Sequence, residues 1–271
     1  MNERTDGAGS LSSAFQPVCL VTGASGYVGR ALMPELARAC ERVQGRSIAH
    51  IRADSPRLES CRRDMSPLGI EIDSTPWDAD AMAASFAKLA LTHVFHLVGT
   101  TKAQAAKDGI RAPYETVDHA LFATLIAALA PLSPAPRVIY LSSRGAAAQS
   151  SSAYLRTRYR CEQLLRASGL PFTIARPGLI TGPRRDPPRR AEALAAHALQ
   201  PISRLLAALG LGGSASRLRP FDAHEIAYGL VHAGFNYTTI GRALAGDELR
   251  YEQTKDREWS GPASHRDGLR H

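Results

Sequence analysis

Three evenly spaced glycines form the pattern in this chain whose chemistry is easiest to interpret. Gly23, Gly26 and Gly29 lie between an apolar run, 17–21, and a helical pattern, 30–38. In such a strand–turn–helix unit the first glycine permits a tight turn and the second lets the backbone approach a pyrophosphate. The third lets the helix pack closely against the strand, and the helix N-terminus turns N–H groups toward the phosphates. The pattern predicts a dinucleotide-binding turn.

Apolar β-rich runs alternate with helical stretches over the first two thirds of the chain. Continuous apolar strands separated by helices are typical of a parallel sheet that is covered on both faces. Right-handed crossovers then give a doubly wound arrangement. The sequence therefore predicts an α/β, doubly wound parallel sheet, a Rossmann fold, with a small C-terminal region on the substrate side. After the first strand, strands are expected at 46–52, 69–72, 92–99, 137–143 and 171–176, and helices at 30–38, 80–91, 116–129 and 154–168.

A single domain is expected over residues 17–249. Residues 1–16 are polar and lack the apolar block of a secretory signal, so we predict a disordered leader. Residues 250–271 are polar and irregular, which predicts a disordered tail. The Ala/Leu-rich helical stretch at 184–215 is either a substrate-side or oligomer-contact element or ordinary core. Asp222 is expected to be the N-cap of a late helix.

Composition argues against several classes of protein. The 271 residues carry a net charge of +8, but only 6% are aromatic, and the densest basic run, 184–190, is broken by prolines. Nucleic-acid binding is therefore not expected. The four cysteines lie far apart in the sequence, which argues against disulfides or a metal site and favours a reducing compartment. No run approaches the roughly 20 apolar residues of a membrane span, so no membrane span is expected. We expect a cytoplasmic protein that is a monomer or a homodimer.

Several segments, in order along the chain, carry a resemblance to a known family. Residues 22–29 read Thr-Gly-x-x-Gly-x-x-Gly, residues 97–101 read Leu-Val-Gly-Thr-Thr, and residues 141–143 read Leu-Ser-Ser. Residues 176–178, Arg-Pro-Gly, are followed by Thr-Gly-Pro-Arg at 181–184. Together these segments resemble the short-chain dehydrogenase/reductase superfamily in its extended and atypical branch. Within that branch they are most similar to the Tat-interacting-protein-like oxidoreductases.

The resemblance implies a catalytic tyrosine that is followed, four residues later on the same helix, by a lysine. Here Tyr154 is followed by Arg158. A cation one turn away stabilises a phenolate, and in the family it also holds the nicotinamide ribose. A guanidinium is effectively never deprotonated, so no proton relay through Arg158 is expected, whereas electrostatic assistance and a ribose contact remain open.

The resemblance also implies that Ser143 hydrogen-bonds the substrate carbonyl beside Tyr154, which acts as the acid/base. Both residues have a structural alternative. A serine at a strand end can simply satisfy backbone groups, and a helical tyrosine can simply be half-buried packing.

The end of the second strand bears on the choice of cofactor. NAD enzymes place an acidic residue there for the ribose 2′-OH, whereas an arginine accommodates the 2′-phosphate of NADP. Arg52 follows this strand, Asp54 lies two residues on, and Arg30 follows the third glycine. The two arginines favour NADP over NAD, unless both are merely solvated. The residues expected to bind the cofactor are Thr22, Gly23, Ser25, Gly26, Tyr27, Val28, Gly29, Arg30, Arg52, Val98, Gly99, Thr100, Pro177 and Gly178.

These expectations combine into an NADP-dependent oxidoreductase that acts on a small carbonyl or alcohol. The replacement of the family lysine by Arg158 favours one alternative, a protein that binds NAD(P)H for regulation or assembly without turnover. A second alternative is a sugar-nucleotide epimerase or dehydratase, against which the missing lysine and the short C-terminal region argue. Nothing in the sequence identifies the substrate.

Overall fold

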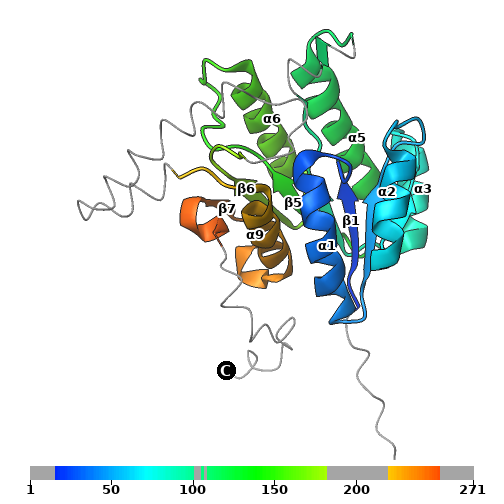
Figure 1. Ribbon diagram of the computed structural model, residues 1–271. Helices are drawn as coiled ribbons and strands as arrows, with labels where there is room; N and C mark the ends of the chain where they lie inside the picture. The colour runs from blue at the N-terminus through cyan, green and yellow to red at the C-terminus, as the bar shows by residue number, and fades with distance from the viewer. Residues whose placement is uncertain (1–15, 101–104, 107–108, 182–218, 251–271) are drawn as a thin grey trace, which may run out of the picture.

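A seven-stranded parallel sheet forms the centre of the protein in the computed structural model, which describes residues 16–100, 105–106, 109–181 and 219–250 (Figure 1). Its spatial order is β3-β2-β1-β4-β5-β6-β7, and every neighbouring pair is parallel. This order confirms the predicted Rossmann arrangement. The strands are β1 (Val18–Thr22), β2 (Arg46–His50), β3 (Glu71–Asp73), β4 (His93–His96), β5 (Arg137–Leu141), β6 (Phe172–Arg176) and β7 (Ala243–Ala245).

Some of the helices begin at a residue whose side chain satisfies one of their first N–H groups. The Asp78 side chain accepts from the Ala81 amide at 2.9 Å, and Asp222 forms a capping box with Glu225, which confirms the predicted late N-cap. The helices are α1 (Tyr27–Glu41), α2 (Leu58–Met65), α3 (Ala79–Leu89), α5 (Ala120–Leu129), α6 (Ala153–Ala167) and α9 (Ala223–Phe235), with short turns η1 (Ser66–Leu68), η2 (Tyr114–His119), η3 (Tyr237–Thr239) and η4 (Gly246–Leu249).

Both faces of the sheet are buried, because successive strand residues point to opposite sides. Cys19 and Val21 of β1 join the core under α1, α2 and α9, whereas Leu20 joins the core under α3, α5 and α6. Helices α1 and α9 pack against each other on the first face (Figure 1). This two-layer covering is what makes the fold doubly wound.

The structure differs from the predicted elements mainly at their ends. Strands β4 and β5 stop at His96 and Leu141, earlier than the predicted 99 and 143. One further amide beyond each strand still donates to a neighbouring strand, Leu97 to Thr22 and Ser142 to Ala175. After that the strand pattern is lost, and the Thr100 amide donates to the Asp118 side chain at 3.0 Å. The helix expected at 116–129 begins as the π-helical turn η2. Neither α2 nor β7 was predicted, since both are short and weakly patterned.

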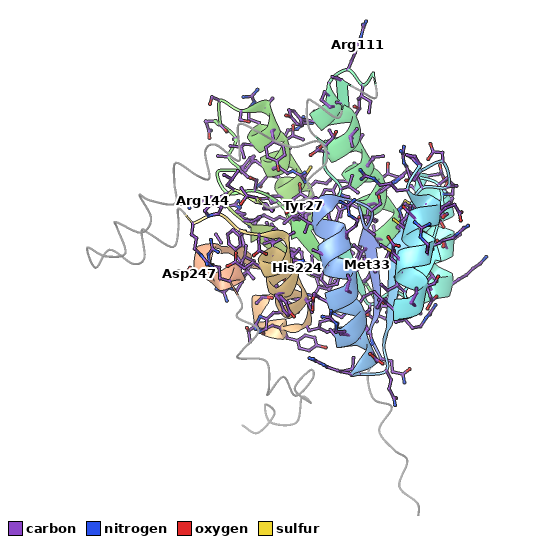
Figure 2. The ribbon with its side chains drawn as sticks, viewed as in Figure 1. Tyr27, Met33, Arg111, Arg144, His224 and Asp247 are labelled. Carbon is purple, nitrogen blue, oxygen red and sulfur yellow. The ribbon has the colours of Figure 1, made fainter. Side chains whose placement is uncertain are left out.

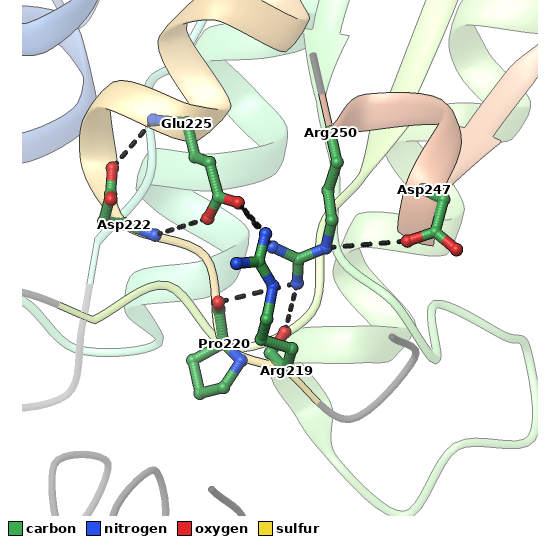
Figure 3. A network of polar contacts seen from close by, with 6 residues as sticks. All are labelled: Arg219, Pro220, Asp222, Glu225, Asp247 and Arg250. Carbon is green, nitrogen blue, oxygen red and sulfur yellow. Dashed lines mark hydrogen bonds and ion pairs between the residues drawn. The ribbon is translucent and has the colours of Figure 1, made fainter. Parts of the chain in front are cut away.

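A compact polar network fixes the segment that precedes α9 (Figure 3). Arg250 donates to Glu225 at 2.8 Å and its guanidinium carbon lies 3.8 Å from the centre of the Phe221 ring. Phe221 in turn donates its amide to the Leu179 carbonyl at 2.8 Å. The network therefore ties the start of α9 to the chain beyond β6. The sequence placed Arg250 at the start of the predicted tail, 250–271, but its contacts with Glu225 and Phe221 hold this residue against the domain.

Other expectations fall on residues that the structure does not describe. The leader before Gln16, the 184–215 stretch, the basic run and the tail after Arg250 all lie outside the described ranges. Among the residues that are described, no helix has the length and apolar character needed to cross a bilayer. The same residues contain no group of three or more His, Cys, Asp or Glu placed to hold a metal ion.

Two buried histidines of β4 couple stability to pH. Burial, assisted by the charge of Arg137, lowers the pKa of His93 to about 4. At pH values between this folded-state pKa of about 4 and the usual pKa of about 6.5, the unfolded chain binds a proton at His93 and the folded chain does not. Acidification from pH 7 to pH 5 should therefore lower the free energy of unfolding by about 2 kcal/mol through His93 alone. The neighbouring His96, whose pKa is also lowered by burial, acts in the same direction.

Replacing His93 by Leu should remove its share of this pH dependence. Urea unfolding of the wild type and of His93→Leu at pH 5 and pH 7 measures the difference directly. His224→Gln, at an exposed position of α9, is the control and should keep the wild-type dependence. An unchanged pH dependence in His93→Leu would contradict the assignment.

Candidate active site

The glycine-rich turn connects β1 to α1 at the carboxyl edge of the sheet, and its glycines serve different purposes. Gly23 has φ +78°, and a Cβ there would lie 2.9 Å from backbone atoms of Leu97 and Val98. A Cβ on Gly29 would lie 2.3 Å from the Gly23 carbonyl oxygen. At Gly26 the nearest atom to such a Cβ is the Gly23 oxygen, at 3.1 Å. A Cβ at Gly23 or Gly29 would come closer than 3.0 Å to several backbone atoms, so the fold itself requires both glycines. A Cβ at Gly26 would meet a single backbone oxygen, and less closely, so the folding requirement there is weaker.

The N-terminus of α1 lies where a ligand of this fold would be expected. β1 has β2 on one side and β4 on the other, so chain connections leave in opposite directions at the carboxyl ends of β1 and β4. Ligands of open α/β sheets bind in the crevice at such a switch point. Gly26 is the N-cap of α1 and no side chain caps this helix end. The first N–H groups of α1 are thus suited to phosphate oxygens.

Thr22 and Tyr27, at the two ends of the turn, support it from the protein side. The Thr22 hydroxyl lies 2.7 Å from Nδ1 of His96, so it faces the core. Tyr27, at the N-terminal end of α1 (Figure 2), donates its hydroxyl to the Thr181 carbonyl at 3.2 Å. The turn is therefore braced against both β4 and the chain beyond β6.

Arginines surround the rim of the turn. Arg30 and Arg57 each donate to the Ser25 carbonyl oxygen, at 3.1 Å and 3.3 Å. Arg52 is 60% exposed in its side chain and lies 3.5 Å from the Asp54 carboxylate. Sequence reasoning found Arg30 and Arg52 but missed Arg57, which stands in no motif. Only the folding of the loop after β2 brings Arg57 back to the glycine turn.

The serine and tyrosine of the implied chemistry also lie at this carboxyl edge. Ser143 follows the end of β5, and among the residues that the structure describes its hydroxyl makes one contact, a long one of 3.4 Å to the Arg144 carbonyl. Tyr154 lies in the first turn of α6, half-buried, with its ring centre 5.5 Å from that of Tyr114. The guanidinium carbon of Arg158 lies 5.2 Å from the Tyr154 ring centre, within the range of a cation–π interaction. All three implied catalytic residues are therefore at one end of the sheet.

Arg158 itself points inward. Its Nη2 forms an ion pair with Asp118 Oδ1 at 2.7 Å, and the two side chains are 6% and 0% exposed. Burial lowers the pKa of the Arg158 guanidinium, but Tyr140, Tyr154 and Asp118 outweigh that effect, so the pKa lies above its usual value. Arg158 is therefore a permanent buried cation.

A second buried acid, Glu162, lies one turn further along α6. It accepts a hydrogen bond from the Ser142 hydroxyl at 2.5 Å and from Nε of Arg176 at 2.8 Å, with a second contact to Arg176 Nη2. Ser142 precedes Ser143, and Arg176 precedes the predicted Pro177–Gly178 segment. Glu162 thus joins the ends of β5 and β6 to the helix that carries Tyr154. Sequence reasoning missed it, although its spacing of eight from Tyr154 places both on one helix face.

The remaining predicted cofactor residues lie on the turns after β4 and β6. The Val98 carbonyl accepts from Arg158 at 3.3 Å and the Thr100 amide donates to Asp118. Pro177 accepts from the Arg144 amide at 2.8 Å, and a Cβ on Gly178 would meet nothing within 4 Å. The structure thus gathers the predicted set around one edge of the sheet.

Comparison with protein families and with curated sequences gave different outcomes for this chain. A family model described as the NAD dependent epimerase/dehydratase family matches residues 19–223. No curated protein sequence shows a significant match to the chain. The narrower resemblance to the Tat-interacting-protein-like group stays a prediction.

Solved structures similar to this chain share its fold at low sequence identity. The terminal R domain from the myxalamid PKS-NRPS biosynthetic pathway is 17% identical, with a TM-score of 0.59, and the alignment covers 86% of this chain and 66% of that domain. The UDP-glucuronic acid 4-epimerase from Bacillus cereus is 17% identical, with a TM-score of 0.57 and coverage of 87% and 78%. The Thermus thermophilus UDP-glucose 4-epimerase is 16% identical, with a TM-score of 0.57 and coverage of 84% and 77%.

The glycine geometry predicts a separation between folding and binding. In Gly26→Val the Cβ meets one backbone oxygen at 3.1 Å, which a small shift of the turn relieves, and the side chain enters the space expected for the pyrophosphate. The variant should therefore stay folded and lose NADPH binding. In Gly29→Val the side chain meets backbone in the same turn, so this variant should fail to fold stably. Circular dichroism and fluorescence titration with NADPH measure the two properties. A folded Gly26→Val protein with wild-type affinity would exclude a dinucleotide at this turn.

Proposed function

Because the chain belongs to the NAD dependent epimerase/dehydratase family, we propose that it is an NADP(H)-dependent oxidoreductase of the short-chain dehydrogenase/reductase type, acting on a small carbonyl or alcohol. The observation that carries the choice of NADP is the convergence of Arg30 and Arg57 on the Ser25 carbonyl, beside the exposed Arg52. Two guanidinium groups on one carbonyl oxygen form a cationic pocket edge that an additional phosphate would complete.

The residues at the edge of the sheet fit the cofactor in a definite order. Gly26 and the first N–H groups of α1 would receive the pyrophosphate, and the arginines would receive the 2′-phosphate. Val98, Gly99, Thr100, Pro177 and Gly178 would line the nicotinamide half. When bound, a nicotinamide cofactor supplies or accepts a hydride at the substrate carbon.

The side chains of this protein would handle the substrate oxygen and its proton. In reduction, Tyr154 donates the proton of its hydroxyl to the carbonyl oxygen as the carbon is reduced, and solvent then reprotonates the phenolate. The Ser143 hydroxyl, which makes one long contact within the described part of the chain, donates a hydrogen bond to the same oxygen and orients it. The buried Arg158 cation next to the Tyr154 ring favours the phenolate that forms.

A sugar-nucleotide epimerase is the second candidate. The family description and the two 4-epimerases among the similar structures favour it. That reaction would use the same tyrosine and a retained NAD, so the identity of the preferred cofactor separates the two candidates. Wild-type protein that binds NAD more tightly than NADPH and interconverts UDP-sugars, followed by NMR, would replace the oxidoreductase proposal.

The arginine rim yields a prediction about selectivity. Arg52→Ala and Arg57→Ala should each weaken NADPH binding by about 1.5–3 kcal/mol, because each loses a charge-assisted contact with the 2′-phosphate. NADH affinity should hardly change. Arg62→Ala is the control, since Arg62 is 52% exposed on α2 and pairs with Glu59. Isothermal titration calorimetry with both cofactors measures these values, and equal losses for NADPH and NADH would contradict the assignment.

Turnover gives a separate prediction. Tyr154→Phe should keep NADPH affinity and lose NADPH oxidation by at least about 100-fold across a panel of aldehydes and ketones, because the proton donor is gone. Tyr159→Phe on the same helix is the matched control and should keep its activity. If the wild type binds NADPH tightly but oxidises it with no substrate in the panel, a binding protein without turnover becomes the better description.

A further inference from the structure

Within the described part of the chain, the hydrogen bonds and the ion pair of Arg158 are all made with backbone carbonyls or buried side chains of the protein. Nη1 donates to the Val98 carbonyl and the Leu141 carbonyl, both at 3.3 Å, and to the Tyr140 hydroxyl at 3.1 Å. Nη2 pairs with Asp118, and Nε is buried without a partner among the described residues. Both terminal nitrogens of the guanidinium are thus engaged by groups of the protein itself.

The position of the guanidinium is itself fixed from two sides. Asp118 holds Nη2 through Oδ1, and its Oδ2 accepts from the Thr100 amide at 3.0 Å. On the other side, a Cβ on Gly99 would lie 2.1 Å from Nη2, so only a glycine leaves room for the arginine here. Moving Arg158 toward the crevice would leave a buried carboxylate unpaired, which is strongly unfavourable.

The groups that this ion pair holds are the ends of the two strands that border the crevice. Val98 directly precedes Gly99 and Thr100 after β4, and Leu141 is the last residue of β5, directly before Ser142 and Ser143. Through one guanidinium the pair therefore links the turn beside the nicotinamide half, the serine-bearing strand end, and the ring of Tyr154 on α6.

We propose that Asp118 and Arg158 act together as a positioning pair that sets the ends of β4 and β5, and that Arg158 does not contact the nicotinamide ribose. The proposal rests on the proposed function for the identity of the cofactor. The family resemblance leaves open a contact between Arg158 and the nicotinamide ribose, and the proposal replaces that contact with a positioning role. It also explains why an arginine is accommodated at a lysine position: the planar guanidinium bonds the two carbonyls through Nη1 and the carboxylate through Nη2, whereas an ammonium has a single nitrogen for all three.

The test compares Asp118→Asn with a matched control, Glu115→Gln. Glu115 and Arg160 form an exposed ion pair at 2.7 Å between the same two elements, η2 and α6. Hydrogen exchange of peptides spanning 97–100 and 140–143 should become at least about tenfold faster in Asp118→Asn, because the Thr100 amide loses a charged acceptor and Arg158 is released. Glu115→Gln should exchange like the wild type.

Ligand binding tests whether Arg158 contacts the nicotinamide ribose. NADPH is compared with adenosine 2′,5′-bisphosphate, which carries the adenosine half and the 2′-phosphate but no nicotinamide. Asp118→Asn and Arg158→Lys should each weaken NADPH about tenfold and leave the bisphosphate within about twofold, because only the nicotinamide end depends on the positioning pair. Should Asp118→Asn fail to fold, Asp118→Leu combined with Arg158→Met removes both charges together and should show the same pattern.

Three results would overturn the proposal. One is unchanged exchange at both strand ends in Asp118→Asn. Another is an Arg158→Lys protein that binds NADPH as tightly as the wild type, as a direct ribose ligand would allow. The third is an equal loss of affinity for both ligands, which indicates a general effect on folding. A wild type that binds neither ligand refutes the proposed function instead, and the exchange comparison still decides the positioning role.

Discussion

Buried charges on the inner face of α6 determine how the rest of the site is arranged. Tyr154, Arg158 and Glu162 follow one another at intervals of four residues, so they form one stripe against the sheet. Arg158 pairs with Asp118 and Glu162 with Arg176. Because an unpaired buried charge costs far more than a shifted apolar contact, these pairs constrain the position of α6 along the sheet. Tyr154, at the end of the stripe, is placed accordingly.

The same pairs connect elements that are far apart in the sequence. Asp118 comes from η2, Arg176 from the end of β6, and Ser142 from the end of β5. Each contributes a polar group that bonds to a side chain of α6. Ser142 and Arg176 directly precede Ser143 and Pro177 in the sequence, and Asp118 accepts from the Thr100 amide, so each is linked to a residue expected to meet cofactor or substrate. The apolar cores on the two faces of the sheet hold the layers together without fixing such detail, because hydrophobic contact is not directional. Directional polar contacts provide the precision at the carboxyl edge.

The glycine turn shows a related separation between what folding needs and what binding would need. Gly23 and Gly29 are required by backbone that passes within about 3 Å, so they would be needed in a protein of this fold with any function. A Cβ at Gly26 would meet only one backbone oxygen, at 3.1 Å, and the Arg30 and Arg57 guanidinium groups converge on the carbonyl one residue before it. The features that suggest a ligand are therefore distinct from those that form the turn.

The sequence by itself determined the order of strands and helices, the parallel sheet and the glycine turn. Each depends on local spacing: apolar runs of strand length, a helical period, and glycines three residues apart. It also located Ser143, Tyr154 and Arg158 through motif resemblance. Tertiary structure alone decided that Arg158 faces inward, that Arg57 returns to the turn, and that Asp118 and Glu162 are buried partners. These are contacts between residues that lie 14 to 60 positions apart, and no local pattern specifies which distant acceptor a buried charge will meet.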